Sequence, residues 1–207
     1  MSHAVIGIGN PGAEYDGTYH NAGAMLVREL AGDDACWTAR PGFRYCKRDD
    51  VVYAVTDGYM NESGRGVASL LGFFKIPAAD MILAHDDTDQ ELGCVRMRRG
   101  GGAGGHRGVA SVIASLGTDA FWRLKIGARP ARFSGEHRVK AAGFVLSRFG
   151  DEEAAVLYGE TFPAAAKLVS NVIENEMPSG PERTSVTGRS TRASDGSASS
   201  DRLKESS

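Results

Sequence analysis

Short apolar runs typical of strands alternate with amphipathic runs typical of helices along most of this chain. The strand-like runs are Ala4–Ile8, Val51–Thr56, Met81–Ala84, Cys94–Arg98 and Trp122–Ile126, with a weaker candidate at Gly143–Leu146. The helix-like runs are His20–Leu30, Ser63–Phe74, His106–Leu116 and Asp151–Glu174, and Pro163 should kink or break the last one. This alternation predicts an α/β fold: a single three-layer α/β/α domain with a twisted, mostly parallel mixed sheet, plus an antiparallel excursion at Trp37–Tyr53.

The chain is long enough for one domain with a sizeable core. Of its 207 residues, 42% are apolar, and the strand and helix patterns fall within residues 1–177. Residues 178–207 hold nine serines and no aromatic residue, so they cannot bury enough surface to offset the entropy of ordering. We therefore expect an α/β domain over 1–177 and a disordered Ser-rich tail over 178–207.

Nothing in the composition suggests a membrane or secreted protein. No apolar run approaches the ~20 residues that cross a bilayer, and the first residues lack the pattern of a secretory signal. Three cysteines, Cys36, Cys46 and Cys94, include no CxxC pair and suit a reducing compartment. These features indicate a cytoplasmic protein without a membrane segment.

The net charge of −2 hides a strongly basic stretch. From Cys94 to Arg148 there are eleven Lys and Arg residues against two acidic residues, a net charge of +9, whereas Asp151 to Glu176 holds six acidic residues and one Lys. A charge run is often only a solvated face. Here it coincides with the glycine-rich loop Gly100–Gly105, and this combination favours a partner that carries phosphates.

Polar residues gather where the predicted strands end. Four such groups occur: Asn10 with His20 and Asn21, Met60–Gly64, His85–Asp89, and Gly100–Gly108. Ligands of open α/β sheets bind at the carboxyl ends of the strands, so these groups are expected to form one site. The sequence contains neither a Gly-x-Ser-x-Gly elbow nor a GxxxxGK[ST] loop, so a covalent nucleophile and a P-loop are not indicated.

One motif favours a different function. The run from Gly7 to Gly12 fits the dinucleotide fingerprint GxGxxG and follows a strand. Pyrophosphate binding requires a helix that starts inside the glycine run with free N–H groups, but Pro11 has no N–H and Asp16–Thr18 reads as loop. No acidic residue ends a second strand about 20 residues later. A nucleotide-dependent oxidoreductase therefore rests on this motif alone, and we expect no cofactor.

The histidines and carboxylates allow two kinds of chemistry. A buried carboxylate can orient the imidazole of His20, which can then deprotonate water because an imidazole has an ordinary pKa of ~6.5. The amides of Asn10 and Asn61 could hold a substrate carbonyl or the developing oxyanion. The weaker alternative is a metal site with His85, Asp86, Asp87 and Asp89 as ligands. Successive residues point in different directions, and no HxxxH pair supports them. We expect no metal.

Each of these polar residues also has a purely structural interpretation. Asn10 could serve the turn before Pro11, Asn61 could cap the helix that begins near Ser63, and His106 could simply start a helix. Four groups at strand ends are harder to explain in this way together than singly.

The motifs IGIGNPGAEYDGTYHNAG, MNESG, HDDTD, GGGAGGHRG and FWRLKIGARP, in this order, resemble bacterial-type peptidyl-tRNA hydrolase from Val5 to about Leu146. The resemblance implies a monomeric, metal-free α/β/α enzyme that cleaves the ester between a peptide and the 3′ ribose of tRNA. By motif position, His20 would be the general base and Asp86 would orient it. Asn10 and Asn61 would bind the substrate near the ester.

The resemblance also implies contacts with tRNA. Tyr15 would line the site beside the terminal nucleotide, and Tyr59, at a position where the family usually has Phe, would contact tRNA as well. Arg98 and Lys125 match the basic positions that clamp the tRNA 5′-phosphate. The segments Gly100–Gly105 and Arg129–Ala142 resemble mobile edges of the peptide groove.

The sequence departs from the family pattern at several positions. Arg107 stands where the family motif GGHGGHNG has a substrate-binding Asn, Ala103 stands where it has the earlier His, and Tyr19 replaces a usual Arg. An Arg donates but cannot accept, so it cannot reproduce an amide at a substrate-binding position. These changes predict a working enzyme that is slower or binds its substrate less tightly. The competing class is a non-catalytic RNA-binding module on the same fold, which would have little reason to keep His20 and Asp86 together.

Overall fold

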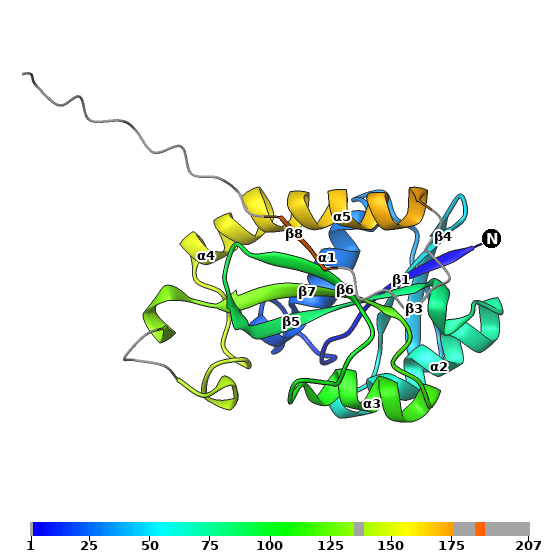
Figure 1. The fold of residues 1–207 in the computed structure, drawn as a ribbon, viewed down its shortest axis with the longest axis horizontal. Coiled ribbons are helices and arrows are strands. Elements are labelled where there is room, and N and C mark those ends of the chain that lie inside the picture. Colours follow the sequence, from blue (N-terminus) through cyan, green and yellow to red (C-terminus); the bar gives the residue numbers. More distant parts are fainter. Residues whose placement is uncertain (1, 135–138, 176–184, 189–207) are drawn as a thin grey trace, which may run out of the picture.

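A computed structural model describes residues 2–134, 139–175 and 185–188, and its centre is one mixed β-sheet (Figure 1). The strand order is β2-β3-β4-β1-β5-β7-β6-β8. The pairs β4–β1, β1–β5 and β5–β7 are parallel, and in the described part of the chain only β3 and β6 run against the other strands. The strands are β1 His3–Gly7, β2 Thr38–Arg40, β3 Phe43–Arg48, β4 Val51–Thr56, β5 Met81–Glu91, β6 Val95–Arg99, β7 Trp122–Arg129 and β8 Ser185–Gly188.

Helices cover both faces of this sheet, as Figure 1 shows with α1 and α5 above it and α2 and α3 below. One core cluster joins the sheet to α1 (Ala22–Ala31) and α5 (Phe162–Glu174), and the other joins it to α2 (Ser63–Phe74) and α3 (Arg107–Leu116). The central strands are buried on both faces, which explains their nearly continuous apolar runs. The predicted three-layer α/β/α architecture is confirmed. No helix within the described ranges is long and apolar enough to cross a membrane.

The predicted break at Pro163 takes the form of a π-helical turn. Helix α4 (Asp151–Val156) passes through the turn Leu157–Thr161 into α5, and Pro163 lies in the first turn of α5. Proline has no N–H for the carbonyl four residues earlier and its ring crowds that carbonyl, so a wider turn before it relieves the conflict.

Two expectations differ from the structure. Gly143–Leu146 is not a strand: a 3₁₀ turn covers Ala141–Gly143, and Phe144 and Val145 pack against Tyr19 in a small separate cluster. Within the segment expected to be a disordered tail, Ser185–Gly188 instead forms β8 against β6, where it satisfies backbone groups that an edge strand would leave unpaired. The rest of 178–207, and 135–138 of the expected groove edge, lie outside the described residues.

Gly7 of the GxGxxG motif and Gly23 of α1 serve helix packing. A Cβ on Gly7 would lie 2.4 Å from the Gly23 carbonyl oxygen, and a Cβ on Gly23 would lie 2.2 Å from the Ala84 carbonyl oxygen. Only glycine permits these approaches, so the start of α1 lies directly on β1 and β5. This contact brings the segment that carries His20 to the strand that carries Asp86.

Candidate functional site

A cavity of about 800 Å³ opens at the carboxyl ends of the parallel strands. The glycine-rich loop and residues 139–146 form two of its edges. Of the nine residues predicted for the site, only Arg98 does not line the cavity. The eight that do are Asn10, Tyr15, His20, Tyr59, Asn61, Asp86, Arg107 and Lys125.

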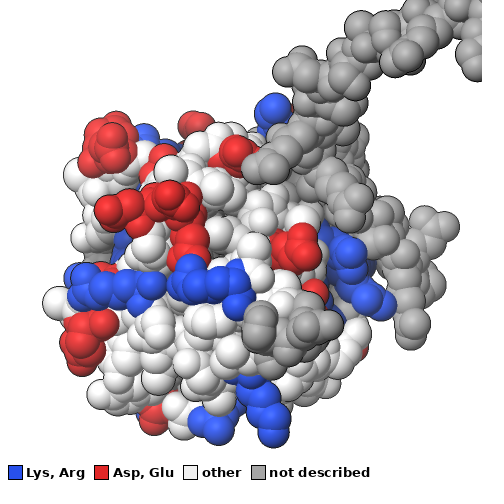
Figure 2. All heavy atoms as spheres, turned by 90° about the vertical axis from the view of Figure 1, so that its left-hand side faces the viewer, with Lys and Arg blue, Asp and Glu red and all other residues white. Residues whose placement is uncertain are grey.

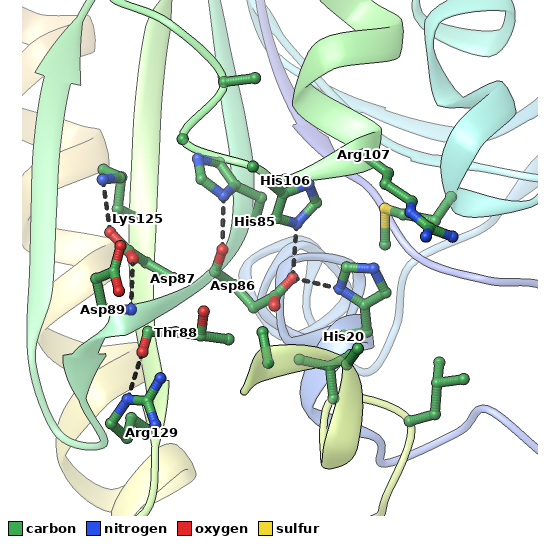
Figure 3. Close-up of a pocket in the computed structure, with 18 of the residues that line it drawn as sticks. His20, His85, Asp86, Asp87, Thr88, Asp89, His106, Arg107, Lys125 and Arg129 are labelled. Carbon is green, nitrogen blue, oxygen red and sulfur yellow. Dashed lines mark hydrogen bonds and ion pairs between the residues drawn. The ribbon is translucent and has the colours of Figure 1, made fainter. Parts of the chain in front are cut away.

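Two imidazoles converge on the carboxylate of Asp86 (Figure 3). Nδ1 of His20 and Nε2 of His106 each lie 2.8 Å from the same oxygen, Oδ1 of Asp86. Asp86 lies on β5 with 2% of its side chain exposed, His20 lies in the 3₁₀ turn Tyr19–Asn21 (η1), and His106 is the N-cap of α3. The predicted pairing of His20 with Asp86 is therefore present.

The cap of α3 fixes the tautomer of His106. Its Nδ1 accepts from the backbone N–H groups of Gly108 at 3.1 Å and Val109 at 3.2 Å, so this nitrogen carries no proton. In the neutral ring the proton is then on Nε2, which donates to Asp86.

An ionised Asp86 also accepts a hydrogen bond from His20. Burial alone would raise the pKa of Asp86, but the two imidazoles hold it well below its usual range. A carboxylate only accepts, so Nδ1 of His20 carries the proton that faces Asp86. The lone pair on Nε2 of His20 is left available as a base.

By spacing alone, His20, Asp86 and His106 could hold a metal ion. The hydrogen bonds argue against it, because Nε2 of His106 carries a proton and has no lone pair for a cation while its Nδ1 caps α3. A metal would have to displace that proton and disturb the cap. Of the residues in the earlier alternative (His85, Asp86, Asp87 and Asp89), only Asp86 belongs to this cluster.

His85 is buried beside the site and is neutral. Its Nδ1 lies 2.7 Å from the Asp86 backbone carbonyl and its ring meets His106 edge-on with centroids 4.9 Å apart. Burial, followed by the nearby His106, lowers the pKa of His85 to about 3. The unfolded chain protonates this ring below about pH 6.5, whereas the folded protein does not until about pH 3.

Acid should therefore destabilise the protein through His85. The free energy of unfolding is expected to fall as pH decreases from about 6.5 towards 3, by at most about 1.4 kcal/mol per pH unit from this group. His85→Gln, which keeps a donor for the Asp86 carbonyl, should flatten the slope between pH 6.5 and 5, where carboxylates contribute least. Urea unfolding at several pH values measures this, and equal slopes in both proteins would contradict it.

Asn10 is held in one orientation by neighbours on two sides. Asn21, buried in η1, accepts from the Asn10 N–H at 2.8 Å and donates to the Asn10 carbonyl at 3.0 Å. The side-chain oxygen of Asn10 accepts from the backbone N–H of Met60 at 2.8 Å. This leaves Nδ2 of Asn10 as the donor without a partner among the described residues, so the amide can donate to a carbonyl or an oxyanion.

The remaining predicted substrate contacts are less constrained. Asn61 and Arg107 are exposed at the cavity, and their side chains make no hydrogen bond or ion pair with described residues. Figure 3 shows Arg107 on the opposite side of the His20–Asp86–His106 cluster from Lys125 and Arg129. Tyr59 is 53% exposed at the rim.

The two predicted phosphate ligands lie on neighbouring strands. The β6–β7 register pairs Arg98 with Arg123 and Arg96 with Lys125, so Arg98 and Lys125 are diagonal neighbours on one face of the sheet. Lys125 is engaged by Asp87, with Nζ 2.5 Å from Oδ2. The side chain of Arg98 makes no hydrogen bond or ion pair with the described residues.

Much of the basic stretch is used internally. Figure 2, which faces the end of the molecule with α4, shows acidic side chains beside basic ones rather than a uniformly basic surface. Arg123 and Arg129 donate to backbone carbonyls, Lys125 and Arg132 pair with carboxylates, and Arg148 donates to the Ala13 carbonyl. Among the described Lys and Arg residues of this stretch, four have side chains without a hydrogen bond or ion pair: Arg96, Arg98, Arg107 and Lys140.

Three residues of the site had no predicted role in it. His106 belonged to the predicted polar group Gly100–Gly108 but was assigned no role of its own, although its position before α3 aims it at Asp86. Asn21 belonged to a predicted polar group but not to the site residues. Arg123 is buried and donates to the carbonyls of Gly101 at 2.6 Å and Gly102 at 2.7 Å, which holds the glycine loop. For His106 and Asn21, the available sequence signal was that each is a polar residue next to a predicted site residue, Arg107 and His20 respectively.

Comparisons with known proteins all find one family. A profile of the peptidyl-tRNA hydrolase family matches residues 4–192. The peptidyl-tRNA hydrolase of Dehalococcoides mccartyi is 40% identical over 172 residues, which cover 79% of this chain and 89% of the relative. That of Desulfotalea psychrophila is 38% identical over 189 residues, covering 82% and 96%. The crystal structure of peptidyl-tRNA hydrolase from Acinetobacter baumannii superposes with a TM-score of 0.73 at 29% identity, covering 86% of this chain and 91% of that one.

Proposed function

Because this chain belongs to the peptidyl-tRNA hydrolase family, we propose that it hydrolyses the ester between the peptide and the 3′ ribose of peptidyl-tRNA, with His20 as the general base. The observation that carries the proposal is the hydrogen bond between His20 Nδ1 and Asp86, which leaves Nε2 of His20 free to take a proton from water. The product tRNA returns to translation, so the place of action is the cytoplasm, and we propose a monomer without metal or cofactor.

The reaction follows from these positions. Nε2 of His20 removes a proton from water as the water oxygen attacks the ester carbonyl, and Asp86 stabilises the imidazolium that forms. Nδ2 of Asn10 and the amide of Asn61 donate to the developing oxyanion. The tetrahedral intermediate then collapses: the ester C–O bond breaks and the imidazolium gives its proton to the 3′ oxygen. The products are the free peptide acid and tRNA with a free hydroxyl.

Release of peptide from N-blocked aminoacyl-tRNA by the purified protein in EDTA tests this proposal. Turnover that chelation leaves unchanged is expected. Binding of tRNA without turnover would favour a non-catalytic RNA-binding module, and turnover that EDTA abolishes and Zn²⁺ restores would favour a metal at His20, Asp86 and His106.

Arg98 and Lys125 are proposed to bind the 5′-phosphate of tRNA, with Tyr15 and Tyr59 beside the terminal nucleotides. Arg98→Ala and Lys125→Ala should each raise KM several-fold with little change in kcat, and should reduce the dependence of KM on salt. Arg98→Ala should have the larger effect, because Lys125 already neutralises Asp87. Steady-state kinetics across a KCl series measures both quantities. A wild-type KM that does not respond to salt would refute the phosphate role.

Arg107 is proposed to weaken substrate binding relative to the Asn usual in the family. A guanidinium cannot accept a hydrogen bond, and an exposed Arg must lose side-chain entropy to hold substrate. Arg107→Asn should therefore raise kcat/KM a few-fold, measured with the same substrate. Arg107→Lys, which keeps the charge but not the planar fork, serves as the matched comparison. A lower value for Arg107→Asn than for wild type would show that Arg107 makes a favourable contact of its own.

A further inference from the structure

Tyr19, the residue before His20, carries a buried hydroxyl that the proposed reaction does not use. Its side chain has no exposed surface. The hydroxyl donates to Oε2 of Glu153 at 2.5 Å and accepts from Nη2 of Arg132 at 2.9 Å. Arg132 also pairs through Nη1 with Oε1 of Glu153, and the backbone N–H of Gly150 donates to Glu153 at 2.9 Å. The turn η1, which contains both Tyr19 and His20, is thus joined at one point to the turn after β7 and to the start of α4.

The protonation states of these three groups make the network self-consistent. Burial, followed by the Glu153 carboxylate, raises the pKa of Tyr19 to about 12, so the hydroxyl stays a donor. Burial would raise the pKa of Glu153, but its hydrogen bonds with Tyr19, Gly150 and Arg132 lower it below its usual value. A hydroxyl, a carboxylate and a guanidinium then satisfy one another, and charge-assisted hydrogen bonds of this kind are among the stronger ones.

The backbone around His20 depends on the segment that Tyr19 covers. The His20 N–H donates to the Val145 carbonyl at 2.8 Å and the Tyr19 N–H donates to the Ser147 carbonyl at 3.1 Å. The Tyr19 ring packs edge-on against Phe144 and lies 4.2 Å from the ring of Phe149, centroid to centroid. Residues 144–149 therefore hold the main chain of His20, while Tyr19 anchors them to α4.

We propose that Tyr19 is a positioning residue for the reaction, acting with Arg132 and Glu153; this inference rests on the proposed role of His20. Asp86 restrains only one ring nitrogen of His20. The distance from Nε2 of His20 to the attacking water also depends on where the His20 backbone lies, and small displacements of a base cost a large part of its effect. The network of Tyr19, Arg132 and Glu153 supplies that second restraint.

Tyr19→Phe tests the proposal because it keeps the ring packing and removes only the hydroxyl. We expect kcat to fall on the order of tenfold while KM changes less than about twofold. Exchange of the His20 amide, which the Val145 carbonyl protects, should become faster. Tyr158→Phe is the matched control, because the hydroxyl of this half-exposed tyrosine makes no hydrogen bond with described residues.

A second variant separates positioning from general stability. Glu153→Gln should lower kcat similarly, and the double variant Tyr19→Phe/Glu153→Gln should be no slower than the worse single variant if the groups act as a unit. An unchanged kcat in Tyr19→Phe with a lower melting temperature would mean a purely structural role and would overturn the proposal. If the wild-type protein showed no hydrolysis, the proposed function would fail, and unchanged exchange of the His20 amide in Tyr19→Phe would then overturn the network by itself.

Discussion

His20→Ala is expected to lower kcat by about 10³-fold, the largest loss of any single substitution at the site. The imidazole is the only group in the described cavity wall with both a free ring nitrogen and a carboxylate behind it, so no neighbour can take its place. Its partner His106 cannot substitute, because Nδ1 of His106 caps α3 and its Nε2 carries a proton. Single-turnover release of peptide from N-blocked aminoacyl-tRNA measures the chemical step directly.

The loss should be confined to chemistry. The affinity for tRNA and the melting temperature are expected to stay near those of the wild type, since His20 is partly exposed and makes one side-chain hydrogen bond. His3→Ala, at the opposite end of β1, is the matched control and should retain full turnover. Added imidazole should restore part of the activity of His20→Ala. Persistent turnover in this variant without imidazole would show that another group is the base.

The sequence was sufficient to predict eight of the residues that line the cavity. Strands of a parallel sheet end at one edge, so polar residues placed after Ile8, Thr56 and Ala84 must meet there whatever the details of packing. The glycines Gly7 and Gly9 could also be distinguished from a dinucleotide site on sequence alone, because Pro11 lacks the N–H that such a site requires. The structure shows why Gly7 is a glycine: the backbone of α1 approaches it too closely for a side chain.

The orientations within the site could not be predicted in the same way. That Asn10 must present Nδ2 follows only once Met60 is known to donate to its oxygen, and these residues are fifty positions apart. The tautomer of His106 likewise depends on a cap geometry that no spacing rule specifies. The expected strand Gly143–Leu146 is not formed because Phe144 and Val145 pack against Tyr19, which lies more than 120 positions earlier in the chain.

Asp86→Asn is expected to lower kcat by about 10²-fold, less than removal of the base. In a serine protease triad, replacing the Asp by Asn lowers kcat about 10⁴-fold, because the NH₂ group of the Asn turns toward the histidine and reverses its tautomer. Here Nε2 of His106 also needs an acceptor at the position of Oδ1. The oxygen of the introduced amide would therefore face both imidazoles, and His20 would keep its proton on Nδ1. Only the negative charge that stabilises the imidazolium would be lost.

The proton positions make this argument testable apart from the rate. In wild type and in Asp86→Asn, ¹⁵N NMR of the histidine rings should show the proton of neutral His20 on Nδ1. Asp86→Ala, which removes the acceptor altogether, should release this preference and lose more activity than Asp86→Asn. If Asp86→Asn instead showed the proton on Nε2 of His20 and fell as far as His20→Ala, the amide would have turned, and His106 would not control its orientation. The carboxylate would then act mainly by selecting the tautomer, and its charge would matter less to the reaction.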